Sequence, residues 1–564
     1  MHIGVWGRAA TLATAGVFLV ACGGGGTTTE NLASPDKQIL RANNGVEPNS
    51  FDPTQQTYTY ERAVGIQTYD SLFRAKADAS DVEPVGATSF DVSSDGLTYT
   101  FHLRQNEKWS DGKPVVAGDW VYGWKHFLNP ALAAGYVDPF FDQTIKGASG
   151  YGNVDTSSDA AVDAYLNGLG LSAPDDHTFV VQLDHPAAYF KWVATLWMAV
   201  PLRKDIVEAG GTIKSTDATK LEAWANNAST IVGNGPYMIK EIASKDHVTL
   251  VPNPNYWAPA PHLQQIIYYE IADGNTAYSQ YQTGALDVIG VPLADVTVVR
   301  NDPKLSKEAK LIPTLSQYWI SMNTTRPPLD DKNVRMALAK SIDRDKLVND
   351  IEHGNGKPLP TFIPKGMNGY DESDKAQSFD PTAAKKLLAD SGKKDALAKM
   401  KLITRNSTGS KTLNQFLADQ WSTNLGVNIQ LDVIDSKTVT KNIRKGQFDI
   451  YGLDGWISDY PDQQDWFDIF VTGSCHNLNW GCLSDPNYDK LVQQADAESD
   501  KSKRANLYAQ AHKLLVDNAV VAFMYQPYEY DLIKPYVKGL TITTTDDQNL
   551  PGDGRYNASY ITQH

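Results

Sequence analysis

The chain has 564 residues, including 13 Trp and 27 Tyr, and its formal net charge is −15. This length exceeds what one hydrophobic core usually holds, so we expect two or three domains. The negative charge argues against nucleic acid or an anionic lipid surface as the main partner. The aromatic residues are numerous enough to line a large cleft as well as to fill cores.

The N-terminus has the pattern of an export signal. Arg8 precedes an apolar run over residues 9–18, which is too short to span a bilayer as a mature helix. The run from Leu19 to Cys22 resembles the lipobox of bacterial lipoproteins, in which cleavage leaves the cysteine as a lipidated N-terminus. We predict a signal peptide over residues 1–22, lipid on Cys22 and a flexible Gly- and Thr-rich tether over residues 23–35. An ordinary signal with an unrelated cysteine is the alternative.

The periodicity of apolar residues predicts a mixed α/β chain without internal repeats. A strand is expected at residues 37–42, and a hairpin over residues 90–103 turns at Ser94-Asp95-Gly96. Asp380 and Pro381 have the residue types of a helix N-cap and first turn. The remaining predicted elements are helices at 117–128, 332–350, 381–390, 411–425 and within 488–519, and strands at 428–433 and 448–453.

Cys475 and Cys482 are an even pair in a chain with an export signal. Such pairs are commonly oxidised outside the cytoplasm, so we expect a short-loop disulfide. A metal site with His476 is the alternative, but structural zinc normally has four ligands and the sequence shows no second cluster. We therefore predict no metal and no cofactor. After the signal, no apolar stretch is long enough to cross a membrane.

Motifs of common enzymes are missing from the sequence. Residues 354–358 read Gly-Asn-Gly-Lys-Pro, with Pro where a phosphate-binding loop has Ser or Thr. Asp459, Asp462 and Asp465 would suit glycoside hydrolysis at the right separation, but grouped acids on a loop are more typical of a solvated surface. We therefore expect a binding protein and not an enzyme.

One segment has the residue types of a binding site. Asp459 lies between Trp456 and Tyr460 in the run Gly455 to Pro461. A carboxylate flanked by aromatic side chains can hold a cationic group away from water, because a charge-assisted hydrogen bond offsets the cost of desolvation. A surface turn is the alternative, since Asp, Gly and Pro are common turn residues.

Several motifs occur together in one order and spacing. The most diagnostic block is Trp109-Ser110-Asp111-Gly112, followed by the run from Asp119 to Trp124. Further matches are at residues 44–53, 175–178, 233–237, 253–257, 327–331, 334–338 and 342–344. In this order the motifs resemble family 5 of the extracellular solute-binding proteins, the peptide-binding family of ABC importers, from about residue 37 to the C-terminus.

The resemblance implies an α/β, two-lobed periplasmic-binding-protein-like fold of three regions, with a hinge and a ligand cleft between the lobes. Region I would combine residues 36–69, 190–315 and 524–564. Region II would be inserted at 70–189, and region III would be the second lobe at 316–523. We expect the motif tryptophans to pack in cores or between domains and not to contact the ligand; they are Trp109, Trp120, Trp124 and Trp257. Arg335 and Arg344 are expected on helix surfaces or in structural ion pairs.

The same resemblance implies where a peptide would bind. Its α-amino group would pair with Asp459, and its backbone would lie as an added strand between two segments of the protein. Tyr460 and, less directly, Tyr136 would line the site. The backbone segments are Gly455-Trp456-Ile457 and Thr57-Tyr58-Thr59. An ordinary solvent-facing loop is the alternative for residues 57–59.

The chain departs from the family before Gly455. The best-known member of the family has basic residues that help receive the carboxylate of the peptide, some of them at this place, whereas this chain has Tyr451-Gly452-Leu453-Asp454. Arg444, Lys445 and Lys411 are the nearby cations that could replace them. The resemblance also leaves the solute open, since relatives bind nickel chelates, haem, sugars or murein peptides.

The implied role is that of a monomeric binding lipoprotein that delivers oligopeptides to ABC permease subunits. It would be exported and anchored on the outer side of the bacterial cell membrane or in the periplasm. A surface receptor that reuses the fold without import is the alternative from another functional class.

Overall fold

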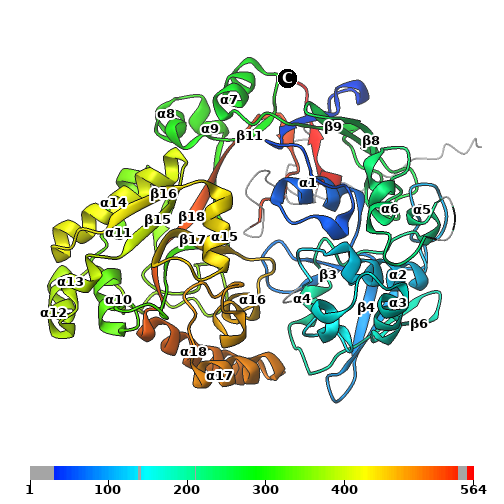
Figure 1. Ribbon diagram of the computed structural model, residues 1–564. Helices are drawn as coiled ribbons and strands as arrows, with labels where there is room; N and C mark the ends of the chain where they lie inside the picture. Colours follow the sequence, from blue (N-terminus) through cyan, green and yellow to red (C-terminus); the bar gives the residue numbers. More distant parts are fainter. Residues whose placement is uncertain (1–30, 138–140, 210, 212, 544–555) are drawn as a thin grey trace, which may run out of the picture.

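The structure, a computed structural model, describes residues 31–137, 141–209, 211, 213–543 and 556–564. The predicted signal peptide, Cys22 and residues 23–30 lie outside these residues. The described chain forms two lobes (Figure 1): one from residues 31–313 with the C-terminal segment, and the other from residues 316–525. Among the described helices, none is long and apolar enough to cross a membrane.

One sheet of 12 strands extends through both lobes. Parallel and antiparallel pairs both occur in it: β15 is parallel to its two neighbours, whereas β13 is antiparallel to both β17 and β18. The strands, in spatial order, are β16 (Gln430–Ile434), β15 (Lys401–Arg405), β17 (Ile450–Ile457), β13 (Ser316–Met322), β18 (Val521–Ile533), β11 (Val288–Gly290), β1 (Ile39–Asn43), β10 (Gln265–Tyr269), β9 (His247–Pro252) and β8 (Tyr237–Ala243), with β12 (Ala309–Pro313) and β14 (Gly356–Pro358) also paired to β18.

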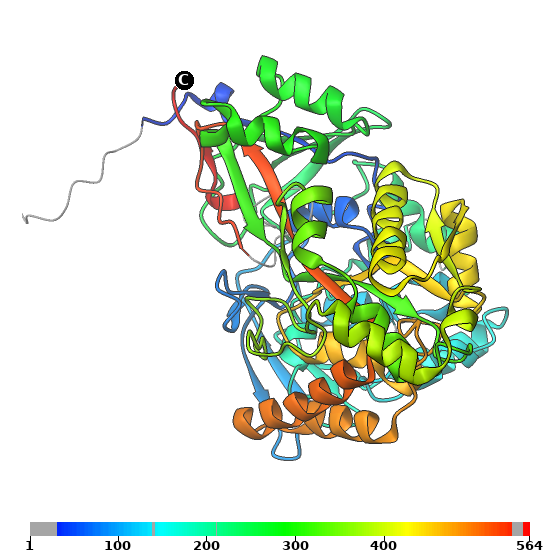
Figure 2. The same cartoon turned by 90° about the vertical axis from the view of Figure 1, so that its left-hand side faces the viewer.

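Strand β18 belongs to both lobes. Its residues Val521 to Tyr525 pair with β13 in the second lobe, and Tyr528 to Leu532 pair with β12 in the first. Figure 2 shows this long orange strand running from one lobe into the other. Because β12 leads into β13 after only two residues, the lobes are joined side by side at two strands. The chain crosses between the lobes at residues 314–315, and again between Tyr525 and Tyr528 of β18.

Both faces of β18 are covered in the second lobe. Val521 and Phe523 enter one buried cluster, and Ala522 and Met524 enter the other. This alternation follows from the two-residue period of a strand. The helices of this lobe are α10 (Lys332–Lys340), α11 (Arg344–Lys346), α12 (Pro381–Ser391), α13 (Lys394–Leu397), α14 (Thr408–Leu425), α15 (Ser436–Arg444), α16 (Gln464–Phe467), α17 (Pro486–Ala497) and α18 (Lys501–Asn518).

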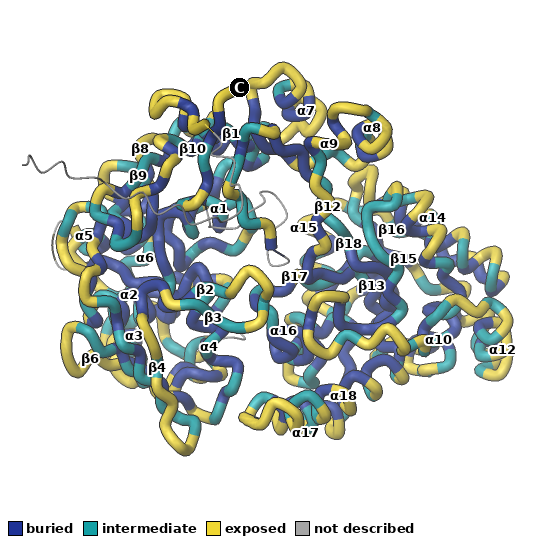
Figure 3. Tube along the Cα trace, turned by 180° about the vertical axis from the view of Figure 1, so that it is seen from behind, coloured by how far each residue is buried: buried dark blue, intermediate teal, exposed yellow. Residues whose placement is uncertain are grey.

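The largest buried cluster of the first lobe includes residues of both predicted regions I and II, and a smaller cluster lies around α7 (Gly274–Thr283) and α8 (Val296–Asn301). Trp109, Trp120 and Trp124 are fully buried in the largest cluster, as expected, whereas Trp257 is half-buried. Figure 3 shows the buried segments of the chain in dark blue.

The remaining strands of the first lobe form one sheet and two pairs. The sheet is β4 (Ala87–Val92), β5 (Thr98–Leu103), β7 (Thr178–Gln182) and β6 (Leu171–Asp175), and the pairs are β2 (Phe73–Ala75) with β3 (Val82–Pro84) and β19 (Val537–Lys538) with β20 (Tyr560–Ile561). The helices of this lobe are α1 (Thr59–Thr68), α2 (Ala117–Phe127), α3 (Asp159–Gly168), α4 (Phe190–Val193), α5 (Lys204–Val207), α6 (Ala218–Glu222), α7 (Gly274–Thr283), α8 (Val296–Asn301) and α9 (Leu305–Glu308).

Residues 31–35 are packed against the C-terminal segment and are not part of a flexible tether. Ala33 N–H donates to Ile561 O at 2.9 Å, and Leu32 bridges Thr562. The amide of the buried Gln38 donates to both Ala33 O and Ile561 O, at 3.0 and 2.8 Å. These bonds join residues 31–38 to the C-terminal segment, so residues 31–35 belong to the folded part of the chain and not to the predicted tether.

The helix predicted over residues 332–350 is interrupted. α10 ends at Lys340, Asp343 caps α11, and residues 347–351 form a π-helical turn. The buried Arg344 donates to Ala339 O, Ile342 O and Phe523 O, at 3.1, 3.1 and 2.6 Å. Its guanidinium thus takes up carbonyls that the broken helix leaves free. Arg335 likewise donates to backbone carbonyls, so the predicted surface or ion-pair role of these two arginines is wrong.

The other predicted elements agree with the structure to within a few residues. Asp380 Oδ1 accepts from Ala383 N–H at 2.9 Å, and Pro381 occupies the first turn of α12, as predicted. The helical stretch 488–519 contains the two helices α17 and α18, which Asp500 separates by capping the second.

The tryptophan side chains of α2 provide a test of the first-lobe core. Trp124 packs edge-to-face on Phe141 and Phe179, with ring centroids 5.4 and 5.1 Å apart. Trp124→Ala should lower the free energy of unfolding by about 3–5 kcal/mol, because the cavity cannot close fully. Phe379, which is 42% exposed, is the matched control, and Phe379→Ala should cost less than about 1 kcal/mol in the same denaturant titration. Equal costs for both variants would contradict the packing described.

Candidate functional site

Strand β17 offers an open edge where it ends. β15 pairs only with its first residues, Ile450 and Tyr451, whereas β13 pairs along its whole length. In the described part of the chain, no strand pairs with residues 453–457 on the side away from β13. Such an edge can accept a further extended segment.

The direction of the free backbone groups at this edge follows from the ladder. Ser458 N–H donates to Leu315 O at 2.8 Å, so it points toward β13. Because the direction alternates along an antiparallel strand, Gly455 and Ile457 point their backbone groups to the open side. A ligand backbone lying beside β17 would therefore meet these two residues.

Glycine is required at position 455 by the neighbouring strand. A Cβ on Gly455 would lie 2.5 Å from Gln317 O, closer than real Cβ atoms come to a backbone oxygen. The Gly455 N–H donates to the side chain of Asp454, at 2.9 Å from Oδ1. Trp319 indole N–H donates to Asp454 Oδ2 at 2.9 Å, and the Ser321 hydroxyl is bonded to the same oxygen.

Burial raises the pKa of Asp454 to about 6, against the opposing effect of these hydrogen bonds. Arg405, at the carboxyl end of β15, contributes a smaller opposing charge. Asp454 occupies a position where the resemblance leads one to expect basic character, and it acts in this chain as an acceptor that fixes β13 and β17 together.

Asp459 lies in the turn that follows β17. Its own N–H donates to Asp465 Oδ2 at 3.1 Å, and the Ser458 hydroxyl is 2.9 Å from the same oxygen. Trp466 indole N–H in turn donates to the Ser458 hydroxyl at 2.9 Å. The turn is therefore held from below by α16, and the carboxylate of Asp459 is half-buried.

Asp465 is fully within the protein beneath this turn. Burial raises its pKa well above the ordinary value, and the charge of the nearby Asp459 raises it further. Asp462 is also buried and forms two bonds of 2.7 Å with the guanidinium of Arg504. The prediction of a solvated acidic surface for Asp459, Asp462 and Asp465 is therefore wrong, because two of the three are buried supports of the turn.

A cavity of about 90 Å³ lies between the lobes beside this turn. Asp459, Tyr460 and Pro461 line it from the second lobe. From the first lobe it is lined by Arg62, Ile66, Tyr69, Asp70, Ser71, Arg74, Ala75, Val85, Thr195, Leu196 and Trp197. The acid predicted from the sequence as an amine receptor therefore faces a cavity that both lobes build.

Aromatic and cationic side chains form the opposite wall. Tyr136 packs edge-to-face on Trp197, with ring centroids 5.1 Å apart. The guanidinium carbon of Arg62 lies 5.1 Å from the centroid of the same Trp197 ring, and the Trp197 indole N–H donates to Gln56 O at 3.0 Å. The predicted Tyr136 is thus joined to the cavity through Trp197.

Residues Thr57, Tyr58 and Thr59 do not form an extended edge. Tyr58 is the N-cap of α1, and the backbone N–H groups of Thr57 and Tyr58 donate to Glu61 Oε2 at 2.7 and 2.9 Å. These two donors are therefore already used inside the helix cap. The segment still lies beside the Tyr136 loop, since a Cβ on Gly135 would be 2.7 Å from Thr57 Cγ2.

The two aromatic residues next to Asp459 differ in exposure. Tyr460 is 1% exposed and packs in the buried cluster of the first lobe, with its hydroxyl bonded to Gln464. Trp456 is half-buried and contacts clusters of both lobes, whereas Ile457 is 36% exposed. Tyr460 thus acts mainly as a packing contact between the lobes at the wall of the cavity.

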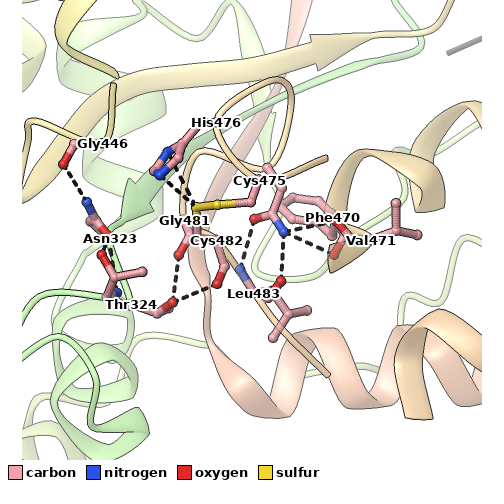
Figure 4. Close-up of a disulfide and its surroundings, with 12 residues drawn as sticks. Asn323, Thr324, Gly446, Phe470, Val471, Cys475, His476, Gly481, Cys482 and Leu483 are labelled. Atoms are coloured by element: carbon pink, nitrogen blue, oxygen red, sulfur yellow. Dashed lines mark hydrogen bonds between the residues drawn. A yellow bond between two sulfur atoms is a disulfide. The ribbon is translucent and has the colours of Figure 1, made fainter. Parts of the chain in front are cut away.

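Cys475 and Cys482 are joined by a disulfide, the pairing that the cysteine count predicts, with an S–S distance of 1.94 Å. His476 Nδ1 lies 3.4 Å from Cys482 Sγ (Figure 4). These three residues are the group of metal-ligand type in the described part of the chain. Because both sulfur atoms are bonded to each other, neither is available as a thiolate ligand.

The sequence alone missed several site residues. Arg62 and Trp197 are far apart in the chain and meet only through folding, and neither is in a motif that names its role. Arg405, which is 3.2 Å from the Tyr451 hydroxyl, is the cation that the structure brings to β17. Arg444, Lys445 and Lys411, the expected cations, are exposed, and Lys411 Nζ donates to Asn406 Oδ1 at 3.3 Å.

Comparison with known proteins decides the family. The sequence profile described as "Bacterial extracellular solute-binding proteins, family 5 Middle" matches residues 81–477. The chain belongs to this family. The oligopeptide-binding protein OppA of Bacillus subtilis is 30% identical over 95% of this chain and 94% of its own length. The periplasmic oligopeptide-binding protein OppA of Salmonella typhimurium is 30% identical over 90% of each chain.

Solved structures of family 5 proteins have the same fold. The Escherichia coli murein tripeptide-binding protein MppA has a TM-score of 0.76 and 27% identity, covering 94% of this chain and 100% of that one. Haemophilus influenzae OppA in complex with RPPGFSPFR has a TM-score of 0.74 and 26% identity, with the same coverage. The two-lobed binding-protein fold predicted from the sequence is confirmed, and the family is one of binding proteins.

The buried Asp454 gives a pH test of the strand that carries the site. Its pKa is about 6 in the folded protein and about 3.9 in an unfolded chain, so the folded protein binds this proton more tightly. Its contribution to the free energy of unfolding is full below about pH 4 and is lost as the pH rises through about 6. Asp454→Asn should therefore gain about 3 kcal/mol relative to wild type between about pH 4 and about pH 7.5 in denaturant titrations. A pH-independent difference would contradict this.

Proposed function

We propose that this chain captures oligopeptides with a free α-amino group between its two lobes. The observation that carries the proposal is the open edge of β17, which ends at a carboxylate in the inter-lobe cavity. Peptides of different sequence share a backbone and an N-terminus. An open strand edge can pair with the backbone and an acid can bind the N-terminal ammonium group, and neither contact depends on the side chains of the peptide.

The polarity of the site supports this proposal. The backbone groups of Ile457 and the carbonyl of Gly455 point to the open side of β17, where they can pair with a peptide in register. Asp459 follows two residues later, so a peptide paired with β17 would place its N-terminus at the carboxylate. The ammonium would then be held by a charge-assisted hydrogen bond away from bulk water.

Residues 57–59 of the first lobe offer a ligand other groups than the open edge of β17 does. Because Glu61 occupies the N–H groups of Thr57 and Tyr58, this segment can offer a ligand its carbonyls and side chains, but not those two donors. The predicted strand addition between two protein strands is therefore proposed here on the β17 side, with Tyr136 and Trp197 covering the ligand from the first lobe.

Capture requires the lobes to separate and close, and the connections between them suit such a movement. The lobes are connected at two adjacent places, the link from β12 to β13 and the strand β18. Small changes of backbone angle at residues 313–316 and 525–528 would therefore rotate one lobe against the other. The names of relatives as oligopeptide-binding proteins support the same ligand class for this chain.

The proposed setting follows from the N-terminal sequence and the relatives. We infer that Cys22 carries lipid and anchors the protein outside the cell membrane or in the periplasm, and that the loaded, monomeric protein docks on ABC permease subunits. Other subunits would hydrolyse ATP. A receptor without a permease would bind peptides in the same site but would not support their uptake by cells.

Direct identification of the ligand tests the proposed class of solute. Protein purified without added ligand and then denatured should release peptides that mass spectrometry can sequence. Release of a metal chelate, haem or a sugar in place of peptides would overturn the peptide assignment.

The role of Asp459 can be isolated by changing each partner in turn. Acetylating the N-terminus of a bound peptide should weaken calorimetric binding to wild type by about 2–5 kcal/mol, the usual loss on removing one partner of a buried charge pair. Asp459→Asn should weaken binding of the free-amine peptide by a similar amount, and acetylation should then add little. Asp163→Asn, an exposed change of equal charge on α3, is the control. Unchanged affinity in Asp459→Asn would remove this residue from the site.

A further inference from the structure

The inter-lobe cavity contains charges of both signs. Its charged lining residues are Arg62, Asp70 and Arg74 from the first lobe and Asp459 from the second. Because the cavity is small and lies between two packed lobes, charges within it are poorly screened by water. The net charge of the lining side chains therefore affects whether a cationic, anionic or neutral group of a ligand is stable in the cavity.

Two of these groups compensate each other inside the first lobe. Arg74 Nη2 is 3.5 Å from Asp70 Oδ1, and Trp257 indole N–H donates to Asp70 Oδ2 at 3.3 Å. Arg104 also acts on Asp70 from behind and lies over the Trp257 ring, 3.5 Å from its centroid. The carboxylate of Asp70 is thus already paired with groups of the first lobe.

The other two charges face the cavity from opposite lobes. Arg62 is on the first turn of α1, is only 9% exposed, and lies over Trp197. Asp459 comes from the turn after β17. Asp465 lies behind Asp459, and its raised pKa reduces the negative charge that it adds. Together Arg62 and Asp459 give the empty cavity a near balance of charge.

A ligand ammonium at Asp459 disturbs this balance, because it adds a positive charge to a cavity that already holds a guanidinium. An excess charge in a desolvated site is costly unless a partner accompanies it. A ligand that supplies an ammonium and a carboxylate close together restores the balance. The carboxylate would then be received by Arg62.

An independent feature also points to an anionic or acceptor group in this cavity. Tyr69 lines it and is 3% exposed, and the Tyr69 hydroxyl has no hydrogen-bond partner among the described residues. A buried hydroxyl without an acceptor is costly, so a group that accepts its proton would be stabilised there. A carboxylate oxygen is such an acceptor.

We propose that the cavity is a selectivity pocket for the first side chain of the bound peptide, and that it prefers Asp or Glu, whose carboxylate binds the Arg62 guanidinium and the Tyr69 hydroxyl. This rests on the proposed function, because it takes the peptide N-terminus to be at Asp459. The volume of about 90 Å³ leaves room for a short side chain. The rest of the peptide, along β17, would be read through its backbone.

Calorimetry with three tripeptides tests the pocket: Glu-Ala-Ala, its neutral isostere Gln-Ala-Ala, and Ala-Ala-Ala. Wild type should bind Glu-Ala-Ala about tenfold more tightly than Gln-Ala-Ala, as expected for one charge-assisted contact. In Arg62→Gln and in Tyr69→Phe this preference, measured as the ratio of the dissociation constants of Gln-Ala-Ala and Glu-Ala-Ala, should fall to about twofold or less. Tyr69→Phe changes one buried oxygen only, so it serves if Arg62→Gln fails to fold. Lys240→Gln, exposed on β8, is the charge-matched control and should keep the preference.

The outcomes separate this inference from the function on which it rests. If wild type binds none of these tripeptides and no longer peptide, the proposed function fails. If it binds all three with equal affinity, or if Tyr69→Phe and Arg62→Gln retain the full preference for Glu-Ala-Ala, peptide binding stands and the selectivity pocket is wrong.

Discussion

The ladder of hydrogen bonds along β18 is the constraint on which both lobes depend. One strand of 13 residues pairs with β13 in the second lobe and with β12 and β11 in the first. Every backbone group along it needs a partner when buried, and each end of the strand finds its partners in a different lobe. The lobes are therefore two packed bodies on one continuous sheet.

The site follows from how that sheet ends. β15 leaves β17 after two residues of pairing, which opens the edge at residues 453–457. The chain then turns, and the buried Asp465, Ser458 and Trp466 fix the turn so that Asp459 faces the first lobe. The open strand edge and the carboxylate thus come from nearly consecutive residues. Under the proposed function, the first would bind the backbone of a peptide and the second its ammonium group.

Buried charged residues have structural roles in this chain. Asp454 occupies a position where basic character is expected from the family and is used to bind Trp319, Ser321 and Gly455 N–H. Arg335 and Arg344 likewise bind backbone carbonyls in place of acids. In each case the charged group is a hydrogen-bond partner for buried polar groups, which are backbone carbonyls for the two arginines and two side chains and one backbone N–H for Asp454. Their removal would expose those groups, so such residues are structural although they are charged.

The sequence by itself determined the family, the two-lobed α/β class, the disulfide pair and most helices and strands, because these depend on local periodicity, caps and motif order. It also singled out Asp459, since an acid between aromatic residues is a local pattern. Only the tertiary structure decided that Asp462 and Asp465 are buried, that residues 57–59 cap a helix, and that Arg62, Tyr69 and Trp197 meet Asp459 across the lobes. Those features depend on which distant segments pack together, and no pattern within a short stretch of chain records that.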